Sequence, residues 1–402
     1  MKVLKALAST LLSLLLFICL IVMGVAVTLN STALNAGFIT GQIDKLDVVT
    51  LFNEEALPTI QKDEQLAAHP EVITSIQNTV EQNAPALKNA VNKAISDIYG
   101  YLLHGETLDL RQTLKTSVLD PQLAISILND IDLSTFIHDL LIENVPLSSA
   151  VIADITVDLT PYTDSIVAVI QPWFKEQVTL LIPKLYDYVL GDSSTLDLNI
   201  PVSSIITDIG SVLKSAVLAS PPPSLAGMSQ TQLSLAIDIF WAQTVPQVPA
   251  TIDLNSSEIG LEQPAEIGQG LDDAQRSLSQ VRQGIVYYQE AFWGLVGLTI
   301  LLVLFIILIN RNVKAIFRIL GSVFATYGII EAAGLLISRG LIHSQLLSLS
   351  DMPQSIQPWL LQFSNSFLNP LLIFSISCAA LGITLFVVSF LYHRKQKPSI
   401  AS

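Results

Sequence analysis

The stretch AFWGLVGLTILLVLFIILI, residues 291–309, decides the fold class, because it is uncharged and long enough to cross a lipid bilayer. A membrane-spanning helix needs about 20 predominantly apolar residues. Three further segments, 6–29, 315–337 and 371–392, have a similar length and composition. The sequence therefore predicts a mainly α-helical membrane protein with four transmembrane helices.

The basic residues beside these segments set the expected orientation, because short cytoplasmic loops accumulate Lys and Arg. Seven basic residues and no acidic ones lie before the first span, between the second and third, and after the fourth: Lys2, Lys5, Arg311, Lys314, Arg394, Lys395 and Lys397. If each segment spans once, these three places share one side. We expect a multi-pass protein of the cell membrane with both termini, the tail 398–402 and a short loop, 310–314, in the cytoplasm.

The long segment between the first two spans, residues 30–290, carries most of the acidic side chains. It contains 32 acidic and 11 basic residues, a formal charge of −21, whereas the whole chain has −14. The topology places this domain, and a shorter loop over 338–370, on the extracytoplasmic side. Its charge disfavours nucleic acid and favours cations or basic protein surfaces as partners. The chain thus divides into 1–29, with the first span, the domain 30–290, and 291–397, with the other three spans.

The first span has an alternative interpretation as a cleaved signal peptide, with Gly24, Val25 and Ala26 as a small-residue cleavage site. Its apolar stretch is longer than the roughly 7–15 residues of a signal-peptide core, which favours a retained anchor. The two cysteines, Cys19 and Cys378, lie inside spans, so we expect no disulfide in the acidic domain.

Most of the acidic domain has helical periodicity. An apolar stripe over 70–102 predicts an amphipathic helix with a break or kink at Pro85, and 163–190 predicts another that Pro172 and Pro183 interrupt. Further helices are expected to start at Asp120-Pro121 and at Ser134. A stripe over 271–288 predicts a stalk helix that runs into the second span.

An internal repeat relates two parts of the domain. Residues 83–103 align with 170–190, which pairs Tyr99 with Tyr186, and Thr-Leu-Asp-Leu follows both segments, at 107–110 and at 195–198. Self-similarity at a fixed offset predicts a duplication. We expect duplicated units over about 44–130 and 131–220, a proline-rich linker at 221–223, and a third part, 224–290, with the stalk helix.

The element Thr-x-Asp-Leu occurs four times, at 107–110, 156–159, 195–198 and 251–254. Alternating polar and apolar residues are typical of a half-buried strand. We expect the four segments to form one small sheet in a helix-rich α+β domain. The apolar residues expected to face the helices are Leu108, Leu110, Val157, Leu159, Leu196, Leu198, Ile252 and Leu254.

The sequence has no GxGxxG, GxxxxGK[ST], HExxH, GxSxG or CxxC motif of the kinds that carry nucleotide binding, metal binding or catalysis. We expect no cofactor, no catalytic residue and no metal-ligand spacing among the five histidines. The outward face of the expected sheet offers one speculative cation site, formed by Asp109, Asp158, Asp197 and Asp253. Solvated surface carboxylates are the simpler interpretation of this set.

Glu331 is the one acidic residue inside a predicted span. Ionisable groups at membrane depth are costly and often functional. Its position, nearly two helical turns from the outer end, also allows an interfacial role or pairing with Arg339 or His343.

The basic entry and glycine-spaced apolar run of 311–337, including Leu320-Gly321, resembles the terminal spans of uncharacterised prokaryotic membrane proteins that have four spans and one large extracytoplasmic loop. The resemblance implies the same topology and brings no activity with it.

These features predict a membrane-anchored extracytoplasmic binding or scaffold protein, not an enzyme, whose partners are the lipid bilayer and another extracytoplasmic protein or ligand. The alternative is the permease-like subunit of an exporter with a large extracytoplasmic domain. A cytoplasmic loop as short as 310–314 argues against this alternative, because it leaves no room for a helix that engages an ATPase. A sensor is disfavoured because no cytoplasmic segment is long enough for an output domain.

Overall fold

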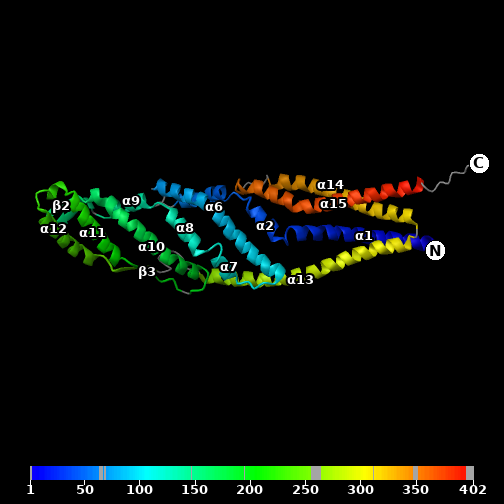
Figure 1. Cartoon of the computed structure of the whole chain (residues 1–402), viewed down its shortest axis with the longest axis horizontal. Helices are drawn as coiled ribbons and strands as arrows, with labels where there is room; N and C mark the ends of the chain where they lie inside the picture. The colour runs from blue at the N-terminus through cyan, green and yellow to red at the C-terminus, as the bar shows by residue number, and fades with distance from the viewer. Residues whose placement is uncertain are drawn as a thin grey trace, which may run out of the picture. The chain divides into compact units, whose positions relative to one another are not determined.

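The computed structural model describes residues 2–62, 67, 69–145, 147–193, 195–254, 264–310, 312–346 and 352–394. In these ranges the chain is mostly helical, with two small sheets (Figure 1). Four helices are long and apolar enough to cross a membrane, as expected: α1 (Lys2–Ser31), α13 (Pro264–Ile309), α14 (Val313–Leu346) and α15 (Ile356–Arg394). The predicted mainly α-helical class with four candidate spans is confirmed.

The chain divides into two compact units, each built from separate parts of the sequence. Unit 1 comprises residues 1–54, 92–108 and 276–402, and unit 2 comprises 55–91 and 109–275. Unit 1 therefore contains α1, α14, α15 and most of α13. Parts of the predicted acidic domain, 30–54, 92–108 and 276–290, belong to unit 1.

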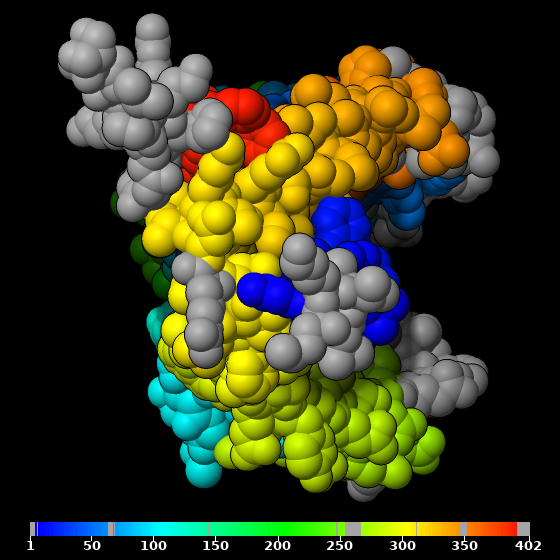
Figure 2. All heavy atoms as spheres, turned by 90° about the vertical axis from the view of Figure 1, so that its right-hand side faces the viewer, coloured from blue at the N-terminus to red at the C-terminus, as the bar shows by residue number. Residues whose placement is uncertain are grey.

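In unit 1, α1 and α13 pack antiparallel. Asn310 Nδ2 donates a hydrogen bond to Ser9 Oγ near the start of α1 (3.3 Å), and Tyr288 Oη donates to the Ala26 carbonyl near its end (2.9 Å). The start of α1, the connection from α13 to α14 and the end of α15 consequently lie at one end of this unit (Figure 1), which Figure 2 shows end-on. Lys5 in α1 and Lys314 in α14 adjoin this end.

Small residues bring α14 and α15 into close contact, also antiparallel. A Cβ atom on Gly321 would lie 2.9 Å from the backbone of Gly382 and Phe386, and one on Gly328 would overlap the backbone of Ser375 and Ala379. Close backbone approach at small residues is a common means of helix packing in membranes. Large side chains fill the rest of the unit 1 core: Leu16, Leu20, Leu302, Ile306, Leu320, Val323 and Tyr327.

Outside the four long helices, the described segments of unit 1 are short. They include α2 (Ala36–Ile43), α3 (Val48–Leu51) and a π-helical turn, Gly100–His104; a second π-helical segment, Phe52–Ala56, crosses into unit 2. Trp359 Nε1 donates to the Gln42 carbonyl (2.7 Å), which ties the start of α15 to α2. α14 and α15 include residues 338–346 and 356–370, so most of the segment expected as a loop over 338–370 is helical.

Unit 2 is a helical domain with two antiparallel β-pairs. Its α-helices are α4 (Leu57–Ile60), α6 (Pro70–Tyr99, whose last turns belong to unit 1), α7 (Leu110–Lys115), α8 (Pro121–Asp130), α9 (Ser134–Asn144), α10 (Thr163–Val189), α11 (Ser203–Ala219) and α12 (Gln230–Thr244). Short 3-10 helices cover Leu147–Ser149, Thr160–Tyr162, Pro223–Leu225 and Val245–Gln247. The helix starts expected at Pro121 and Ser134 are confirmed.

The main core of unit 2 lies between α10, α11, α12 and the hairpin of β1 (Ala150–Ile152) and β2 (Ile155–Val157). Its fully buried side chains include Ile152, Val157, Leu159, Leu213, Val217, Leu225, Leu233 and Ile237. The two turn residues of the hairpin, Ala153 and Asp154, both have positive φ angles (50° and 61°). This backbone shape matches the twist of a two-residue hairpin.

Two long helices of unit 2, α6 and α10, contain prolines in their interiors. α6 continues through Pro85, where the sequence predicted a break or kink, and α10 continues through Pro172 and Pro183, where it predicted interruptions. Neither helix is broken at a proline. A proline inside a helix removes one hydrogen bond and costs about 3 kcal/mol. Burial of apolar side chains along α6 and α10, such as Ile73, Ile166 and Ile182, offsets a cost of this size.

The expectation of one four-stranded sheet is wrong. β2 pairs with β1, whereas β3 (Leu198–Pro201) pairs with β4 (Thr251–Leu254), so the described residues form two separate two-stranded sheets. Residues 107–110 form no strand, because Asp109 instead caps α7 by accepting a hydrogen bond from the Gln112 backbone N–H (3.1 Å). The same short pattern serves equally as a strand and as a helix start.

The burial expected for the Thr-x-Asp-Leu segments is largely met. Five of the eight apolar residues are buried, and all four aspartates are exposed. Leu108 is half-buried, Ile252 is 42% exposed, and the side chain of Leu254 lies outside the described set.

The two expected copies of the repeat agree in their helices and differ after them. Both 83–99 and 170–189 are helical, but 107–110 leads into α7 whereas 195–198 leads into β3. The duplication therefore stays a prediction. The stalk and the second span form one continuous helix, α13, as expected. Arg311, Lys395, Lys397 and the tail 398–402 lie outside the described residues.

Candidate functional site

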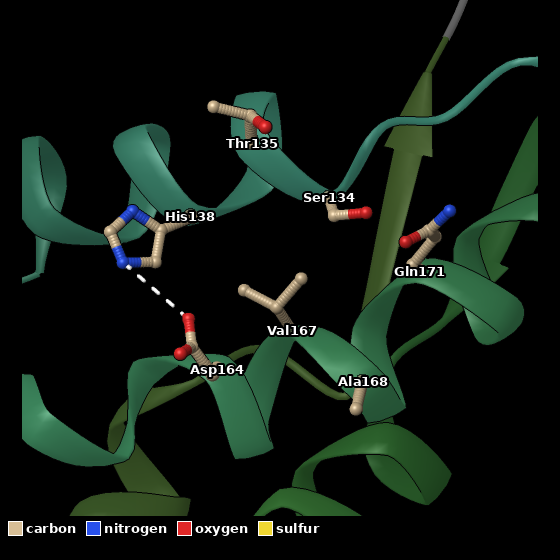
Figure 3. Close-up of a pocket in the computed structure, with 7 residues that line it drawn as sticks. All are labelled: Ser134, Thr135, His138, Asp164, Val167, Ala168 and Gln171. Atoms are coloured by element: carbon tan, nitrogen blue, oxygen red, sulfur yellow. Dashed lines mark ion pairs between the residues drawn. The ribbon is translucent and has the colours of Figure 1, made fainter.

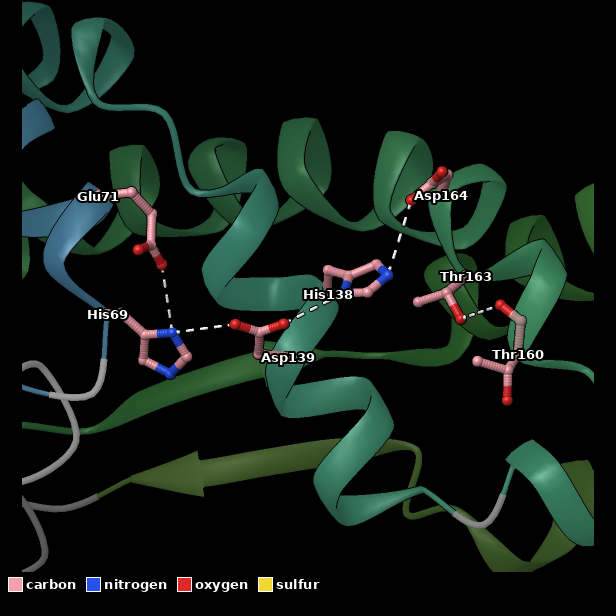
Figure 4. A network of polar contacts seen from close by, with 7 residues as sticks. All are labelled: His69, Glu71, His138, Asp139, Thr160, Thr163 and Asp164. Carbon is pink, nitrogen blue, oxygen red and sulfur yellow. Dashed lines mark hydrogen bonds and ion pairs between the residues drawn. The ribbon is translucent and has the colours of Figure 1, made fainter.

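Two histidines and three carboxylates meet in unit 2, where the starts of α6 and α10 approach α9 (Figure 4). His69 directly precedes α6, and Glu71 lies in the first turn of that helix. His138 and Asp139 are consecutive residues of α9, and Asp164 lies in the first turn of α10. We call these five residues the histidine–carboxylate cluster.

The cluster is a chain of short polar contacts. His69 Nδ1 lies 3.3 Å from Glu71 Oε1 and 3.2 Å from Asp139 Oδ2. The other oxygen of Asp139, Oδ1, lies 3.2 Å from Nδ1 of His138, whose Nε2 is 3.8 Å from Asp164 Oδ1. Asp139 therefore stands between the two imidazoles and presents one oxygen to each.

His69 is the buried member of the cluster. Its residue surface is 6% exposed, and the ring of Phe136 packs edge-on against it with centroids 5.1 Å apart. The Glu71 and Asp139 side chains are 41% and 40% exposed. The imidazole is thus fixed by apolar packing on one side, while its two carboxylate neighbours keep access to solvent.

A shallow cavity of about 430 Å³ adjoins the cluster at His138 and Asp164. Its wall is formed by Ser134, Thr135, His138, Asp164, Val167, Ala168 and Gln171, which come from α9 and α10 (Figure 3). The hydroxyl of Ser134 donates to Asp132 and not to a histidine. This hydrogen bond, together with one from the Ser134 backbone N–H, lowers the pKa of the Asp132 carboxyl.

The four aspartates of the speculative cation site are not brought together. Asp109 caps α7. A hydrogen bond from the Thr160 side chain, together with one from the Thr160 backbone N–H (2.9 Å), lowers the pKa of the Asp158 carboxyl. Asp197 precedes β3, and Asp253 accepts a hydrogen bond from Asn199 Nδ2 across the β3–β4 pair (2.7 Å). In the described part of the chain, the one group of three potential ligands close enough to hold an ion is His69, Glu71 and Asp139.

Glu331 lies half-buried on α14, one turn after the buried Tyr327. Arg339, one of the two partners that the sequence allowed for it, donates hydrogen bonds to the Asn369 side chain (2.7 Å) and to the Asn365 carbonyl (3.2 Å) on α15. A functional role for Glu331 stays a prediction.

Sequence reasoning missed the histidine–carboxylate cluster because its two halves are about 70 residues apart. A weak signal was present, since His69-Pro70-Glu71 and His138-Asp139 each place an imidazole beside a carboxylate. Neither pair has the spacing of a known metal motif, and the two halves are joined by the contacts of His69 with Asp139 and with Phe136 of α9.

Comparison of the chain with protein-family models, with curated proteins and with solved structures found no match.

Proposed function

We propose that this chain is a membrane-anchored binding protein without catalytic activity, whose unit 2 faces the extracytoplasmic side of the cell membrane and binds a ligand or another protein there. The observation that carries the proposal is that unit 2 has a closed apolar core of its own, formed by α10, α11, α12 and the β1–β2 hairpin. A domain with its own core can present a fixed surface to a partner.

The orientation in this proposal is supported by the arrangement of unit 1. The start of α1, the α13–α14 connection and the end of α15 lie at one end of that unit (Figures 1 and 2). The basic residues Lys2, Lys5, Lys314 and Arg394 flank these three places and fit the positive-inside rule. The acidic segment lies on the opposite side in such a topology.

A binding role is favoured over catalysis by the contacts in the unit 2 cavity. Nucleophilic catalysis by serine needs a base within hydrogen-bond reach of its hydroxyl. Ser134 donates its hydroxyl to Asp132, a carboxylate that also accepts a hydrogen bond from the Ser134 backbone N–H at the start of α9. The side chain thus has a structural partner, and His138 lies in contact with Asp139 instead.

The exporter alternative is weakened by the connection between α13 and α14. α13 ends at Ile309 and α14 begins at Val313. Three residues cannot form the cytoplasmic helix through which such a permease would engage an ATPase.

Site-specific photo-crosslinking in native membranes tests the proposal. The probe residue is placed at Leu235 and Ile239, which are 60% and 51% exposed on α12 of unit 2, and, as a matched control, at Lys5 and Lys314 beside the spans. We expect discrete adducts from the unit 2 positions that disappear when excess purified chain competes. Adducts with an ATPase at Lys314, and none at Leu235 or Ile239, would support the permease and contradict the binding role.

A further inference from the structure

We propose that His69, Glu71 and Asp139 bind a divalent transition-metal ion, zinc in the first place, on the surface of unit 2. The donor atoms are Nδ1 of His69, Oε1 of Glu71 and Oδ2 of Asp139, which all lie within 4.8 Å of one another. An imidazole nitrogen and two carboxylate oxygens are ordinary zinc ligands, and three protein ligands leave a fourth position for water or a ligand.

The separations between the donor atoms fit a common ion. Zinc binds nitrogen and oxygen at about 2.0–2.2 Å, so that neighbouring ligands of a tetrahedral ion are roughly 3.3–3.5 Å apart. In the structure, Nδ1 of His69 is 3.3 Å from the Glu71 oxygen and 3.2 Å from the Asp139 oxygen. These two separations match those of a tetrahedral ion, and the Glu71 and Asp139 oxygens lie within 4.8 Å of one another.

The hydrogen bonding of His69 points to a ligand as well. Nδ1 is a buried atom, and neither carboxylate meets it in hydrogen-bond geometry despite the short distances. An N–H group would need an oxygen close to its axis. Two oxygens placed off the axis leave the axis itself for a metal ion, and the imidazole of His69 is oriented toward the gap between Glu71 and Asp139 (Figure 4).

His138 supplies the support that metal ligands usually have. Its Nδ1 contacts the second oxygen of Asp139 at 3.2 Å, which orients the carboxylate so that Oδ2 faces His69. Hydrogen bonds of this kind fix ligand orientation in metal sites. His138 is therefore a positioning residue in this proposal, and Asp164, 3.8 Å from its Nε2, extends the chain.

Charge and access favour a cation in this place. With neutral imidazoles, the carboxylates of Glu71, Asp139 and Asp164 give the cluster three negative charges. A divalent ion offsets two of them. Both carboxylate ligands are about 40% exposed, which gives an ion a path from solvent to the buried nitrogen. The imidazole selects against magnesium and calcium, which prefer sets made only of oxygen.

The metal site does not depend on the proposed partner binding, because metal binding is measured on the purified chain without a partner. The test uses the full-length chain in detergent, without a polyhistidine tag, after removal of metals with a chelator. Zinc stoichiometry is measured by elemental analysis after desalting, and affinity is measured by competition with a chromophoric chelator. Cobalt serves as a second probe, because its visible absorption reports nitrogen and oxygen ligation.

We expect one zinc per chain in the wild type, with affinity that falls as pH drops because protons compete for the imidazole. His69→Ala and the isosteric variants Glu71→Gln and Asp139→Asn should lose this site, and His138→Ala should weaken it by about 10–100-fold. His104→Ala removes an exposed histidine outside the cluster and should leave binding unchanged.

Circular dichroism establishes that each variant is folded, and the two isosteric variants keep the test valid if His69→Ala unfolds. Wild-type zinc affinity in both Glu71→Gln and Asp139→Asn would overturn the proposal. So would a wild-type chain that binds neither zinc nor cobalt, or that binds calcium alone.

Discussion

The side-chain amide of Asn310 donates a hydrogen bond to the hydroxyl of Ser9 over 3.3 Å, and both residues are buried. Asn310 directly follows α13, and Ser9 lies in the third turn of α1, so the contact joins the end of one candidate span to the beginning of another. Because the two helices pack antiparallel, the basic residues Lys5 and Lys314 belong to the same end of unit 1. The topology proposed here depends on this relationship.

Close packing of α14 on α15 predicts a sharp difference between two glycines of α14. A methyl group on Gly328 would overlap the backbone of Ser375 and lie 2.8 Å from Cα of Ala379, whereas nothing lies within 4 Å of one on Gly334. Overpacking of a tight contact typically costs about 1–3 kcal/mol. We expect Gly328→Ala to lower the thermal unfolding midpoint of the chain in detergent, and Gly334→Ala to leave it unchanged or raise it. Equal midpoints for the two variants would show that α14 and α15 do not pack in this way.

The cap at the start of α7 predicts a local effect of Asp109. Replacement by Ala removes the acceptor for the Gln112 backbone N–H and should cost about 1 kcal/mol, whereas Asp109→Asn preserves a capping oxygen. Hydrogen exchange measured by mass spectrometry should show roughly five-fold faster exchange in 110–115 for Asp109→Ala. Unchanged exchange in both variants would contradict the capping role.

Lys115 joins α7 to the end of α10, and this contact should stabilise unit 2. Its ammonium group contacts the carboxylates of Asp187 (2.7 Å) and Asp192, and these hydrogen bonds raise the pKa of Lys115. Lys115→Met should reduce the free energy of unfolding by about 1–2 kcal/mol, because two carboxylates lose their cation. Lys214→Met breaks a single ion pair, with Asp238, that is more exposed to solvent. It should reduce the free energy of unfolding by less than about 1 kcal/mol.

The pH dependence of the Lys115 contact follows from the direction of its pKa shift. A raised pKa in the folded state means that the contact stabilises fully below the ordinary lysine pKa of about 10.4 and is lost as pH rises through the folded-state value. The stability difference between wild type and Lys115→Met should therefore be constant from pH 7 to pH 9 and shrink in more alkaline buffer. A difference that disappears on acidification in this range would assign the effect to another group.

The sequence predicted the parts of the fold that depend on long apolar periodicity. The four spans, the continuous α13 and the starts of α8 and α9 follow from hydropathy, helical stripes and capping residues, which act within one segment. It failed for the four-residue Thr-x-Asp-Leu pattern, because Asp109 as a helix cap and Asp253 as a strand residue have the same local sequence. Tertiary pairing of β3 with β4 decides between the two.

The candidate site was beyond sequence reasoning for a similar reason. His69 and Asp139 are brought to 3.2 Å by the packing of helices, and single histidines in a sequence carry no information about such contacts. The predicted grouping of the carboxylates relied on a sheet that does not form. Asp158 follows β2 of one pair, whereas Asp253 lies in β4 of the other.

Accessibility of single cysteines in intact cells tests the central topology most directly. Cys19 and Cys378 are first replaced by Ala, and one cysteine is then introduced at exposed Asp208 in unit 2 or at Lys314 beside the α13–α14 connection. A membrane-impermeant maleimide should label the cysteine at Asp208 from outside and should label the one at Lys314 only after the cells are opened. Labelling at Lys314 in intact cells, with protection at Asp208, would contradict the account.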